Sequence, residues 1–428
     1  MKEGLYNMNE LKRISIIQSV IDKKRTQKEA ANALGVSERQ IRTLVKRFRE
    51  EGPNGLKHKN KLNKPSHSFS EDFKTKIIQL KLSDNYIDTN FSHFRDLLEE
   101  RENIKISYSA LYNILHSNNI ISKKSHKPRK THRRRKRKEC EGMLVQTDGT
   151  PFDWFNIGKK YSLHGYVDDA TGKILGLYMC ENECLMGYLE ITRQMLKNYG
   201  SPIAIYSDKY SVFFPTSSQK VTVEEQLQGK EKPTTQFKRI MDVLGVELIA
   251  ASTSQAKGRI ERLWETLQDR LVTEFKLNNI KTIEEANEFL PKYIIKYNKK
   301  FAIEPESTES KFIPLPPYVD LDILLTNKFT RVIDNAGTFT IKNKKFQIVD
   351  NNILPNTKVD IYISHKVGII VEHKQKRYKV VCLDNVPSSY STLNLNKICK
   401  EYQLEVKQFA TNLCSYNSKE YSPLLITS

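Results

Sequence analysis

The chain has 428 residues, of which 38% are hydrophobic and 28% charged, and its formal net charge is +20 at pH 7. This length predicts several domains, and the hydrophobic content excludes a mainly disordered protein. Residues 1–138 contain 33 Lys and Arg against 15 Asp and Glu, a charge of +18 that leaves +2 for the rest of the chain. A partner with dense negative charge is expected at the N-terminal third, and nucleic acid is the first candidate.

The six cysteines are scattered, and no second Cys or His pair stands at zinc-ligand spacing. They are interpreted as reduced thiols, and Cys180 and Cys184 are expected to be buried. No apolar segment of the signal-peptide or membrane-spanning type is predicted. We therefore expect a cytoplasmic protein with access to DNA.

Residues 1–52 predict a helix-turn-helix domain of three short helices. Capping boxes at 26–29 and 37–40 begin the second and third helices, and Gly35 ends the second. The third helix presents the side chains that are expected to bind DNA: Arg39, Gln40, Arg42, Lys46 and Arg47. Arg and Gln read base edges in a major groove, and Lys and Arg also hold phosphates. The alternative is a three-helix bundle with a solvated basic face.

Three further segments complete the basic region. Residues 53–69 are a basic linker, and residues 70–122 predict a second helical DNA-binding unit with helices over about 91–101 and 109–118. Residues 123–138 carry eleven basic residues and no acidic one, so they cannot form a core. They are interpreted as an arm that follows DNA phosphates, with a solvated tether as the alternative. The arm residues expected to bind DNA include Lys130, Arg133, Arg134 and Arg135.

The middle of the chain, residues 139–300, predicts a mixed α/β sheet. Apolar strands are expected near 143–148, 160–168, 173–181, 203–208 and 246–250. Helices are expected near 184–199, 235–244 and 256–275, followed by a helical stretch to about 300. Polar residues 209–234 interrupt this order and are interpreted as a loop. The alternation of strands and helices indicates an α/β domain.

The C-terminal part predicts a small all-β domain. A Pro-rich linker at 313–317 precedes it, and residues 329–385 alternate apolar and polar side chains between turns, as is typical of a small β-barrel. Residues 386–428 are interpreted as a weakly ordered tail.

Three carboxylates of the middle segment are candidate metal ligands. Asp148 and Asp208 each end an apolar strand, and Glu261 lies near the start of the helix predicted over 256–275. Two strand carboxylates and one helix carboxylate can converge on hard divalent cations, because Mg²⁺ prefers oxygen ligands and keeps waters for substrate phosphates. Two such ions about 3.5–4 Å apart can hold the attacking and leaving oxygens of a phosphodiester in line.

Three motifs, taken in order, resemble those of a known enzyme family. DGTPFDWF at 148–155, YSD at 206–208 and STSQAKGRIERLWETLQDRL at 252–271 are similar to motifs of DDE-type insertion-sequence transposases with an integrase-like catalytic core. They look most like the ISNCY branch. The order of helix-turn-helix, second helical unit, catalytic core and small β domain fits as well, so the resemblance covers the chain to about residue 385.

The resemblance implies a multidomain protein with all-α helix-turn-helix N-terminal units, an α/β RNase H-like catalytic core and a small all-β barrel. It implies that Asp148, Asp208 and Glu261 are catalytic and hold Mg²⁺ (or Mn²⁺), expected as two ions. The implied partner is double-stranded DNA, both the element's terminal inverted repeats and the target. A homo-oligomer is expected because two ends must be joined, whereas no membrane or small-molecule partner is expected.

The implied reaction hydrolyses a phosphodiester at the end of the element and frees a 3′-hydroxyl. That hydroxyl then attacks target DNA by transesterification. Cut-and-paste and copy-based outcomes both stay open. Two other functions are also open: a non-catalytic or domesticated regulator that uses only the helix-turn-helix, and an RNase H-like nuclease for branched DNA or hybrids. The intact carboxylates argue against the regulator, and the multi-part DNA-binding region argues against the nuclease.

Two features depart from the family pattern. Asp208 and Glu261 are 53 positions apart, more than in retroviral-type cores, and the surplus falls in the loop 209–234. Lys257 stands where many relatives have Asn, and its cation is expected to touch a DNA phosphate near the metals. Arg259 is expected to neutralise phosphate or to form a pair on the helix surface.

Other residues compete for the catalytic roles. Glu265, one helical turn beyond Glu261, is the main rival for the third ligand. Trp264 is expected to pack in the core. The neighbouring aspartates are expected to shape loops and turns, although the first is also a rival ligand: Asp153, Asp168 and Asp169.

Overall fold

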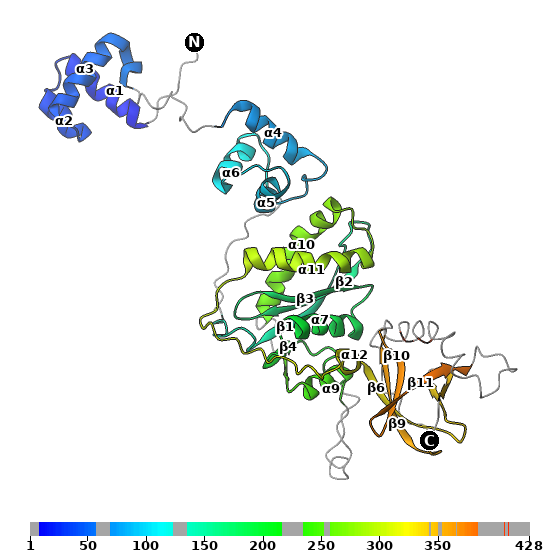
Figure 1. The fold of residues 1–428 in the computed structure, drawn as a ribbon. Helices are drawn as coiled ribbons and strands as arrows, with labels where there is room; N and C mark the ends of the chain where they lie inside the picture. Colours follow the sequence, from blue (N-terminus) through cyan, green and yellow to red (C-terminus); the bar gives the residue numbers. More distant parts are fainter. Residues whose placement is uncertain are drawn as a thin grey trace. The chain divides into compact units, whose positions relative to one another are not determined.

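The computed structural model describes residues 8–56, 69–122, 135–215, 234–251, 257–341, 344–349, 353–364 and 366–383, together with residues 406 and 410. The chain divides into two compact units, Met1–Leu80 and Lys81–Ser428. Figure 1 traces their helices and strands along the chain. Within the described ranges, no helix is both long enough and apolar enough to cross a bilayer.

The first unit contains three helices followed by a 3-10 turn: α1 (Met8–Ile21), α2 (Gln27–Leu34), α3 (Glu38–Glu51) and η1 (Gly52–Leu56). Both predicted capping boxes form, since Thr26 and Ser37 accept N–H groups three residues on, and the side chains there accept the caps' own N–H groups. Gly35 ends α2 with a φ of 64°, a conformation that favours glycine. Ile17 and Ile41 are fully buried between the helices. The predicted helix-turn-helix region is therefore confirmed.

Helix α4 (Glu71–Leu82) spans the boundary between the units, and the second unit continues with α5 (Phe91–Arg101) and α6 (Tyr108–Ser117). Asn90 and Ser107 cap α5 and α6, because each side chain accepts an N–H group from the first turn of its helix. Both helices lie within one residue of their predicted places.

The centre of the second unit is a five-stranded mixed sheet with the strand order β3-β2-β1-β4-β5. Its strands are β1 (Val145–Phe152), β2 (Tyr161–Asp168), β3 (Ile174–Cys180), β4 (Ala204–Ser207) and β5 (Glu247–Ala250). β1, β2 and β3 form an antiparallel meander, and β4 and β5 run parallel to β1. The predicted mixed α/β core is confirmed.

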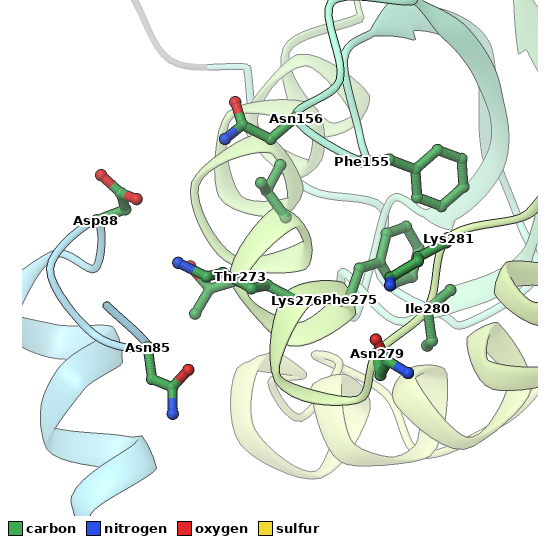
Figure 2. Close-up of a pocket in the computed structure, with 11 residues that line it drawn as sticks. Asn85, Asp88, Phe155, Asn156, Thr273, Phe275, Lys276, Asn279, Ile280 and Lys281 are labelled. Carbon is green, nitrogen blue, oxygen red and sulfur yellow. The ribbon is translucent and has the colours of Figure 1, made fainter. Parts of the chain in front are cut away.

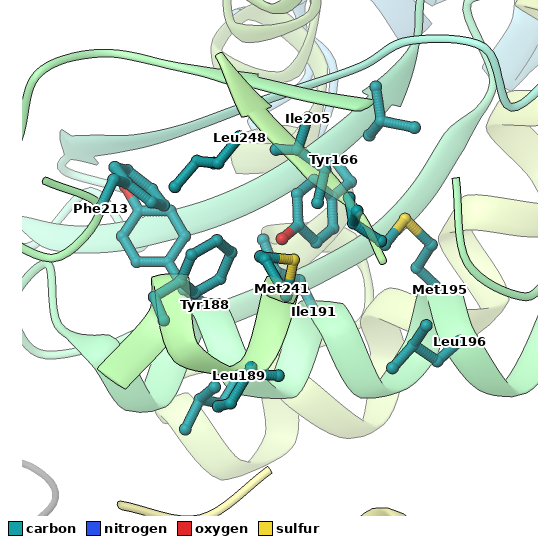
Figure 3. Packing of buried hydrophobic residues seen from close by; sticks show 14 of the residues in the cluster. Tyr166, Tyr188, Leu189, Ile191, Met195, Leu196, Ile205, Phe213, Met241 and Leu248 are labelled. Atoms are coloured by element: carbon teal, nitrogen blue, oxygen red, sulfur yellow. The ribbon is translucent and has the colours of Figure 1, made fainter. Parts of the chain in front are cut away.

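Helices pack against this sheet in two groups (Figure 1): α7 (Leu185–Asn198) with α9 (Gln236–Val243), and α10 (Gly258–Leu277) with α11 (Ile283–Phe301). The first group packs around Tyr166, Tyr188 and Ile205, which lie close together in Figure 3. The second group packs around Leu163 and Trp264. Tyr166 and Leu163, three positions apart on β2, thus belong to clusters on opposite faces of the sheet, as the alternation of side chains along a strand requires. Packing on both sides of the sheet holds the ends of its strands in place.

Strand β1 extends further than the sequence predicts. The prediction ended this strand at Asp148, but β1 continues to Phe152 because its whole length pairs with β2. Asp148 therefore lies within the strand, opposite Gly165, and the expected position at its C-terminal end is wrong. Relative to β4, however, Asp148 lies beyond the paired region, since β1 pairs with β4 at Val145 and Gln146.

The predicted linker at 313–317 is packed against the core. Ser201 and Ile313 exchange backbone hydrogen bonds of 2.8 and 2.9 Å. Leu315 contacts the cluster of α7 and α9. The segment is therefore attached to the α/β core by hydrogen bonds and apolar packing.

The C-terminal region has a short helix and six strands: α12 (Leu321–Leu324), β6 (Asn327–Val332), β7 (Thr338–Ile341), β8 (Lys344–Ile348), β9 (Lys358–Ser364), β10 (Gly368–His373) and β11 (Lys376–Cys382). The strands form an antiparallel sheet in the order β6-β9-β10-β11-β8-β7, which confirms an all-β region. Closure of this sheet into a barrel stays a prediction. Val406 and Ala410 are buried in its apolar cluster. The rest of the predicted tail, and residues 216–233 of the predicted loop, lie outside the described residues.

Candidate active site

Asp148 and Asp208 are brought together by two adjacent parallel strands. β1 and β4 pair at Val145 with Ile205, and β4 ends one residue before Asp208. Continuing this register along both strands sets Asp208 opposite Asp148. Because both strands belong to the packed sheet, the two carboxylates emerge at neighbouring points.

Lys257 is the cation between the two aspartates. Its Nζ lies 2.6 Å from Asp148 Oδ1 and 3.9 Å from Asp208 Oδ2, and only 8% of the residue is exposed. The indole N–H of Trp264 also donates to Asp148 Oδ2 at 3.2 Å. Burial nevertheless raises the pKa of Asp148, since the lowering effects of Lys257 and Trp264 are too small to offset burial and the nearby charge of Asp208. Among the described residues, the two aspartates therefore share a single ammonium group.

Helix α10 is held against the sheet at its first turn. Gln146 Oε1 accepts the backbone N–H groups of Arg259 and of the next residue, each at 3.2 Å, so β1 satisfies N–H groups that a helix start leaves free. Gly165 on β2 lets Trp264 approach closely, because a Cβ there would lie 2.6 Å from the indole ring. This close approach puts the indole N–H on Asp148, a contact that the expected core-packing role of Trp264 missed.

Glu261 lies at the solvent-exposed edge of the α10 face that is turned toward β1. Lys257 and Trp264 contact Asp148, and Gln268 donates to the Thr150 hydroxyl at 3.3 Å. These three residues form one helical stripe, and Glu261, four positions after the lysine, belongs to it.

The structure does not bring the Glu261 carboxylate to the aspartates. This side chain is exposed, and it has no hydrogen bond or ion pair with a described residue. Within the described ranges, no group of three or more His, Cys, Asp or Glu side chains is arranged to hold a metal ion. The rival Glu265 is also exposed and lies about 40° further round the helix.

Glu183 is a further carboxylate that the sequence reasoning missed. It lies between β3 and α7, and its Oε1 accepts the hydroxyl of Tyr188 at 2.5 Å. Its pKa is raised to about 7, mainly by burial and also by the charges of Asp148 and Asp208, while the Tyr188 hydroxyl and Lys257 act in the opposite direction. A carboxylate that follows a strand is the signal used for Asp148 and Asp208, but the same signal applied to β3 points first to Glu181, and only the packing of the folded chain distinguishes Glu183.

Comparison with known proteins identifies the family. A model of a helix-turn-helix domain matches residues 12–64. The transposase for insertion sequence IS1202 of Streptococcus pneumoniae is 33% identical over 369 residues, which cover 79% of this chain and 77% of that protein. The chain belongs to the insertion-sequence transposases. A putative transposase of Sinorhizobium fredii (strain NBRC 101917 / NGR234), y4bF, is also 33% identical, over 82% of this chain and 75% of its own length.

Solved structures offer a weaker likeness to this transposase. The integrase catalytic core domain of HTLV-2 in complex with magnesium is 15% identical, covers 40% of this chain and 93% of its own, and has a TM-score of 0.28. A chain of a simian T-cell lymphotropic virus intasome is 13% identical over 72% of this chain and 96% of its own, with a TM-score of 0.30. TM-scores of this size carry no argument about the fold. Family membership rests on the sequence relatives, and it makes the chain a DNA-binding enzyme that cleaves and transfers DNA strands.

The third helix of the transposase's helix-turn-helix presents most of its predicted DNA-binding residues to solvent. Arg39, Gln40, Arg42 and Lys46 are exposed, and Arg47 is half-buried. Gln40 has a second task, because its Oε1 accepts the N–H of the N-cap Ser37 at 3.2 Å. The amide nitrogen of Gln40 can donate to a base edge. The role of all five residues in DNA binding stays a prediction.

The end of the basic arm is anchored to the core through a buried aspartate. Asp169 is fully buried, forms an ion pair with Arg135, and accepts the backbone N–H of Lys138 at 2.9 Å. Arg259 Nε lies 3.6 Å from the same carboxylate, so this residue forms an ion pair with the core rather than the expected pair on the helix surface. These contacts give Arg135 and Arg259 a structural task beside the predicted one. The predicted DNA-binding residues Lys130, Arg133 and Arg134 lie outside the described residues.

The remaining candidates behave as structural residues. Asp153 accepts the N–H groups of Ile157 and Gly158 at 3.0 and 2.7 Å, so it caps a loop as expected. Asp168 accepts the N–H and hydroxyl of Thr171 within the predicted turn. The thiols of the two neighbouring cysteines are free and buried, as predicted: Cys180 and Cys184.

A separate cavity of about 280 Å³ lies beside the C-terminal end of α10 (Figure 2). Asn85 and Asp88 line it from the loop before α5, and Phe155 and Lys276 line it from the core. None of the predicted catalytic residues lines this cavity, so it is not the candidate active site.

Proposed function

We propose that this transposase binds the terminal inverted repeats of an insertion sequence and cleaves and transfers DNA strands with Asp148, Asp208 and Glu261 as ligands of two Mg²⁺ (or Mn²⁺) ions. The observation that carries the proposal is the pair of aspartates on adjacent strands that share a single lysine ammonium. The position of Lys257 Nζ is a point within reach of both carboxylates that a cation can occupy.

The donor set suits a hard divalent cation. Carboxylate oxygens are the ligands that Mg²⁺ prefers, and the two aspartates face one lysine cation among the described residues. Glu261 is proposed as the third donor because it lies on the same stripe of α10 as Lys257 and Trp264. Its exposed carboxylate has no partner among the described residues that would compete for it.

The residues of the chain hold and orient this site. Gln146 fixes the start of α10, and the indole of Trp264 orients Asp148. Lys257 has to withdraw from Asp148 when the site is loaded, and its ammonium is then available for a DNA phosphate. When bound, two divalent ions activate the attacking water or hydroxyl and stabilise the charge on the leaving oxygen. No side chain has to form a covalent bond with DNA.

We further propose that the five-stranded domain is an RNase H-like core, that the C-terminal sheet closes as a small barrel, and that the domain limits are those predicted from the sequence. The helix-turn-helix then selects the element's ends through α3, and the basic arm and C-terminal domain bind flanking or target DNA. Two ends must be joined, so the working form is a homodimer or a larger homo-oligomer on DNA.

The test is a plasmid excision assay with Mg²⁺ and the purified Asp148→Asn variant. Strand cleavage is expected to fall about a thousandfold, equivalent to about 4 kcal/mol of activation free energy. Binding to the terminal repeats should be kept. Asp153→Asn is the matched control, because Asp153 caps a loop, and it should keep its activity. Unchanged cleavage by Asp148→Asn would sink the assignment.

A further inference from the structure

The side chain of Glu183 is packed against the strand that carries Asp148. A Cβ built on Gly149 would lie 2.9 Å from both the Cγ and the carboxyl carbon of Glu183. The glutamate therefore covers the residue next to Asp148 at a distance that only glycine permits. The charges of Asp148 and Asp208 both act on Glu183, so a third carboxylate, from the loop between β3 and α7, lies near the aspartate pair, although the three described side chains do not form a metal site as they stand.

Two buried aromatic rings hold this loop in place. Tyr188, fully buried on α7, donates its hydroxyl to Glu183 Oε1, and its ring meets that of His164 edge-on at 4.8 Å between centroids. His164 Nε2 in turn accepts the backbone N–H of Cys184 at 3.2 Å. The residues on both sides of the loop are therefore fixed to the sheet, and Glu183 has little freedom to turn away from the site.

Glu183 has no positive partner of its own. Within the described ranges it forms no ion pair with Lys, Arg or His, and the one cation that pairs with Asp148 or Asp208 is Lys257. Its partner Tyr188 is a neutral donor. A half-buried carboxylate beside two others is unfavourable unless positive charge is added. If the only role of residue 183 were to accept the Tyr188 hydroxyl, a neutral glutamine would do this as well as a glutamate.

We propose that Glu183 is an additional carboxylate ligand of the divalent cations at Asp148 and Asp208. This inference rests on the proposed function, since it requires that those aspartates bind metal. Glu183 releases the Tyr188 hydroxyl as the site is loaded, and it adds the negative charge that a second divalent ion needs.

The experiment measures metal affinity directly with Tb³⁺, a hard cation that takes oxygen ligands. Trp264 lies on Asp148, so excitation of its indole should sensitise Tb³⁺ luminescence at this site, and Trp264→Phe should remove that signal. Glu183→Gln in the full chain is expected to weaken Tb³⁺ binding about tenfold. Displacement of Tb³⁺ by Mg²⁺ should show the same loss.

Two matched variants separate a ligand from a structural residue. Glu181→Gln changes a carboxylate of the same loop whose side chain is 68% exposed and paired with Lys159, and it should leave the Tb³⁺ affinity unchanged. Tyr188→Phe removes the hydroxyl that holds Glu183 but keeps the carboxylate, so the affinity should stay the same or rise. If Tyr188→Phe and Glu183→Gln lose the same Tb³⁺ affinity, the hydrogen bond between the two residues acts only by holding the loop in place. That result would overturn the proposal.

Asp148→Asn in the same titration distinguishes the two proposals. If it abolishes the signal while Glu183→Gln binds Tb³⁺ as tightly as the unaltered protein, Glu183 is no ligand and the aspartate site stands. If the unaltered protein binds no Tb³⁺ near Trp264, both proposals fail. Far-ultraviolet circular dichroism of Glu183→Gln confirms that the variant is folded, and the isosteric change keeps an acceptor for Tyr188.

Discussion

Two groups of carboxylates in the second unit have opposite electrostatic surroundings: one at the junction of α5 with α10 and α11, and one at the candidate active site. Between α5, α10 and α11, Asp96 is contacted by Arg270 Nη1 at 2.8 Å and forms a second ion pair with Lys300. Glu274 accepts from Lys296 at 2.6 Å and from His93 at 3.4 Å. At the candidate active site, three carboxylates lie near a single lysine.

The pKa directions record this difference. Burial alone would raise the pKa of Asp96 and Glu274, but the hydrogen bonds and charges of their partners lower both, that of Glu274 to about 2. Burial and neighbouring carboxylates raise the pKa of Asp148 and Glu183. A site with a cation for each carboxylate holds the fold together, whereas a site that lacks cations is prepared to receive them. We therefore interpret the α5 junction as structural and propose the candidate active site as the functional one.

The largest expected effect compares two glutamates on one helix, α10. Glu261→Gln should lower strand cleavage about a thousandfold, because the variant loses a proposed metal ligand. Its free energy of unfolding should change by less than about 0.5 kcal/mol, because the side chain is exposed and has no partner among the described residues. Glu265→Gln is the control and should keep its activity in the same excision assay. A loss in Glu265→Gln and not in Glu261→Gln would exchange the two roles.

The second effect is on stability, at the junction. Asp96→Asn leaves the buried Arg270 and the nearby Lys300 without their carboxylate, which should cost about 3–4 kcal/mol. Urea unfolding of the purified variant measures this loss. Tb³⁺ affinity at the candidate active site should be unchanged in conditions where the variant is folded. Weakened Tb³⁺ binding would show that the two regions are coupled and would break the comparison.

Local interactions explain why much of the fold could be predicted. The capping boxes at Thr26 and Ser37 involve residues three positions apart, so the sequence displays them directly. The core strands are apolar runs that need no knowledge of their partners. The length of β1 was harder, because its extension past Asp148 depends on pairing with β2, a contact between separate segments.

The electrostatic features of both regions were beyond such reasoning. The bond between Arg270 and Asp96 joins residues 174 positions apart, and that between Lys257 and Asp148 spans 109 positions. The type of residue predicted a phosphate contact for Lys257, but only the folded chain shows which carboxylates surround it. Glu183 was missed because its position near the aspartates follows from its packing against Gly149, which the sequence does not display.

The third prediction concerns pH, and Glu274 provides it. Its pKa is lowered from 4.5 to about 2 in the folded chain, so its stabilising contribution is present above pH 4.5 and is lost as the pH falls toward 2. The shift corresponds to about 3 kcal/mol, and the residue is only 3% exposed. Urea midpoints of the unaltered protein and Glu274→Gln should therefore differ most at neutral pH and converge in acid. If the difference between the two urea midpoints does not change with pH, the charge of Glu274 does not stabilise the junction. The charged or titratable groups that face this carboxylate are Lys296 and His93.

The smallest effect on stability tests whether ion pairing without burial matters. Lys46 and Glu50 on α3 form a 3.9 Å pair with side chains that are 78% and 56% exposed. Lys46→Gln and Glu50→Gln should each change the free energy of unfolding by less than about 0.5 kcal/mol, because solvent screens the pair. The two variants should differ in DNA binding. Lys46→Gln removes a predicted phosphate contact, so the slope of log binding constant against log salt concentration should fall by about one for the terminal repeats. Glu50→Gln should not weaken binding. If the two variants bind the terminal repeats with the same affinity and salt dependence, Lys46 does not contact DNA. If either variant loses more than about 1 kcal/mol of unfolding free energy, ion pairs stabilise this protein even where they are exposed.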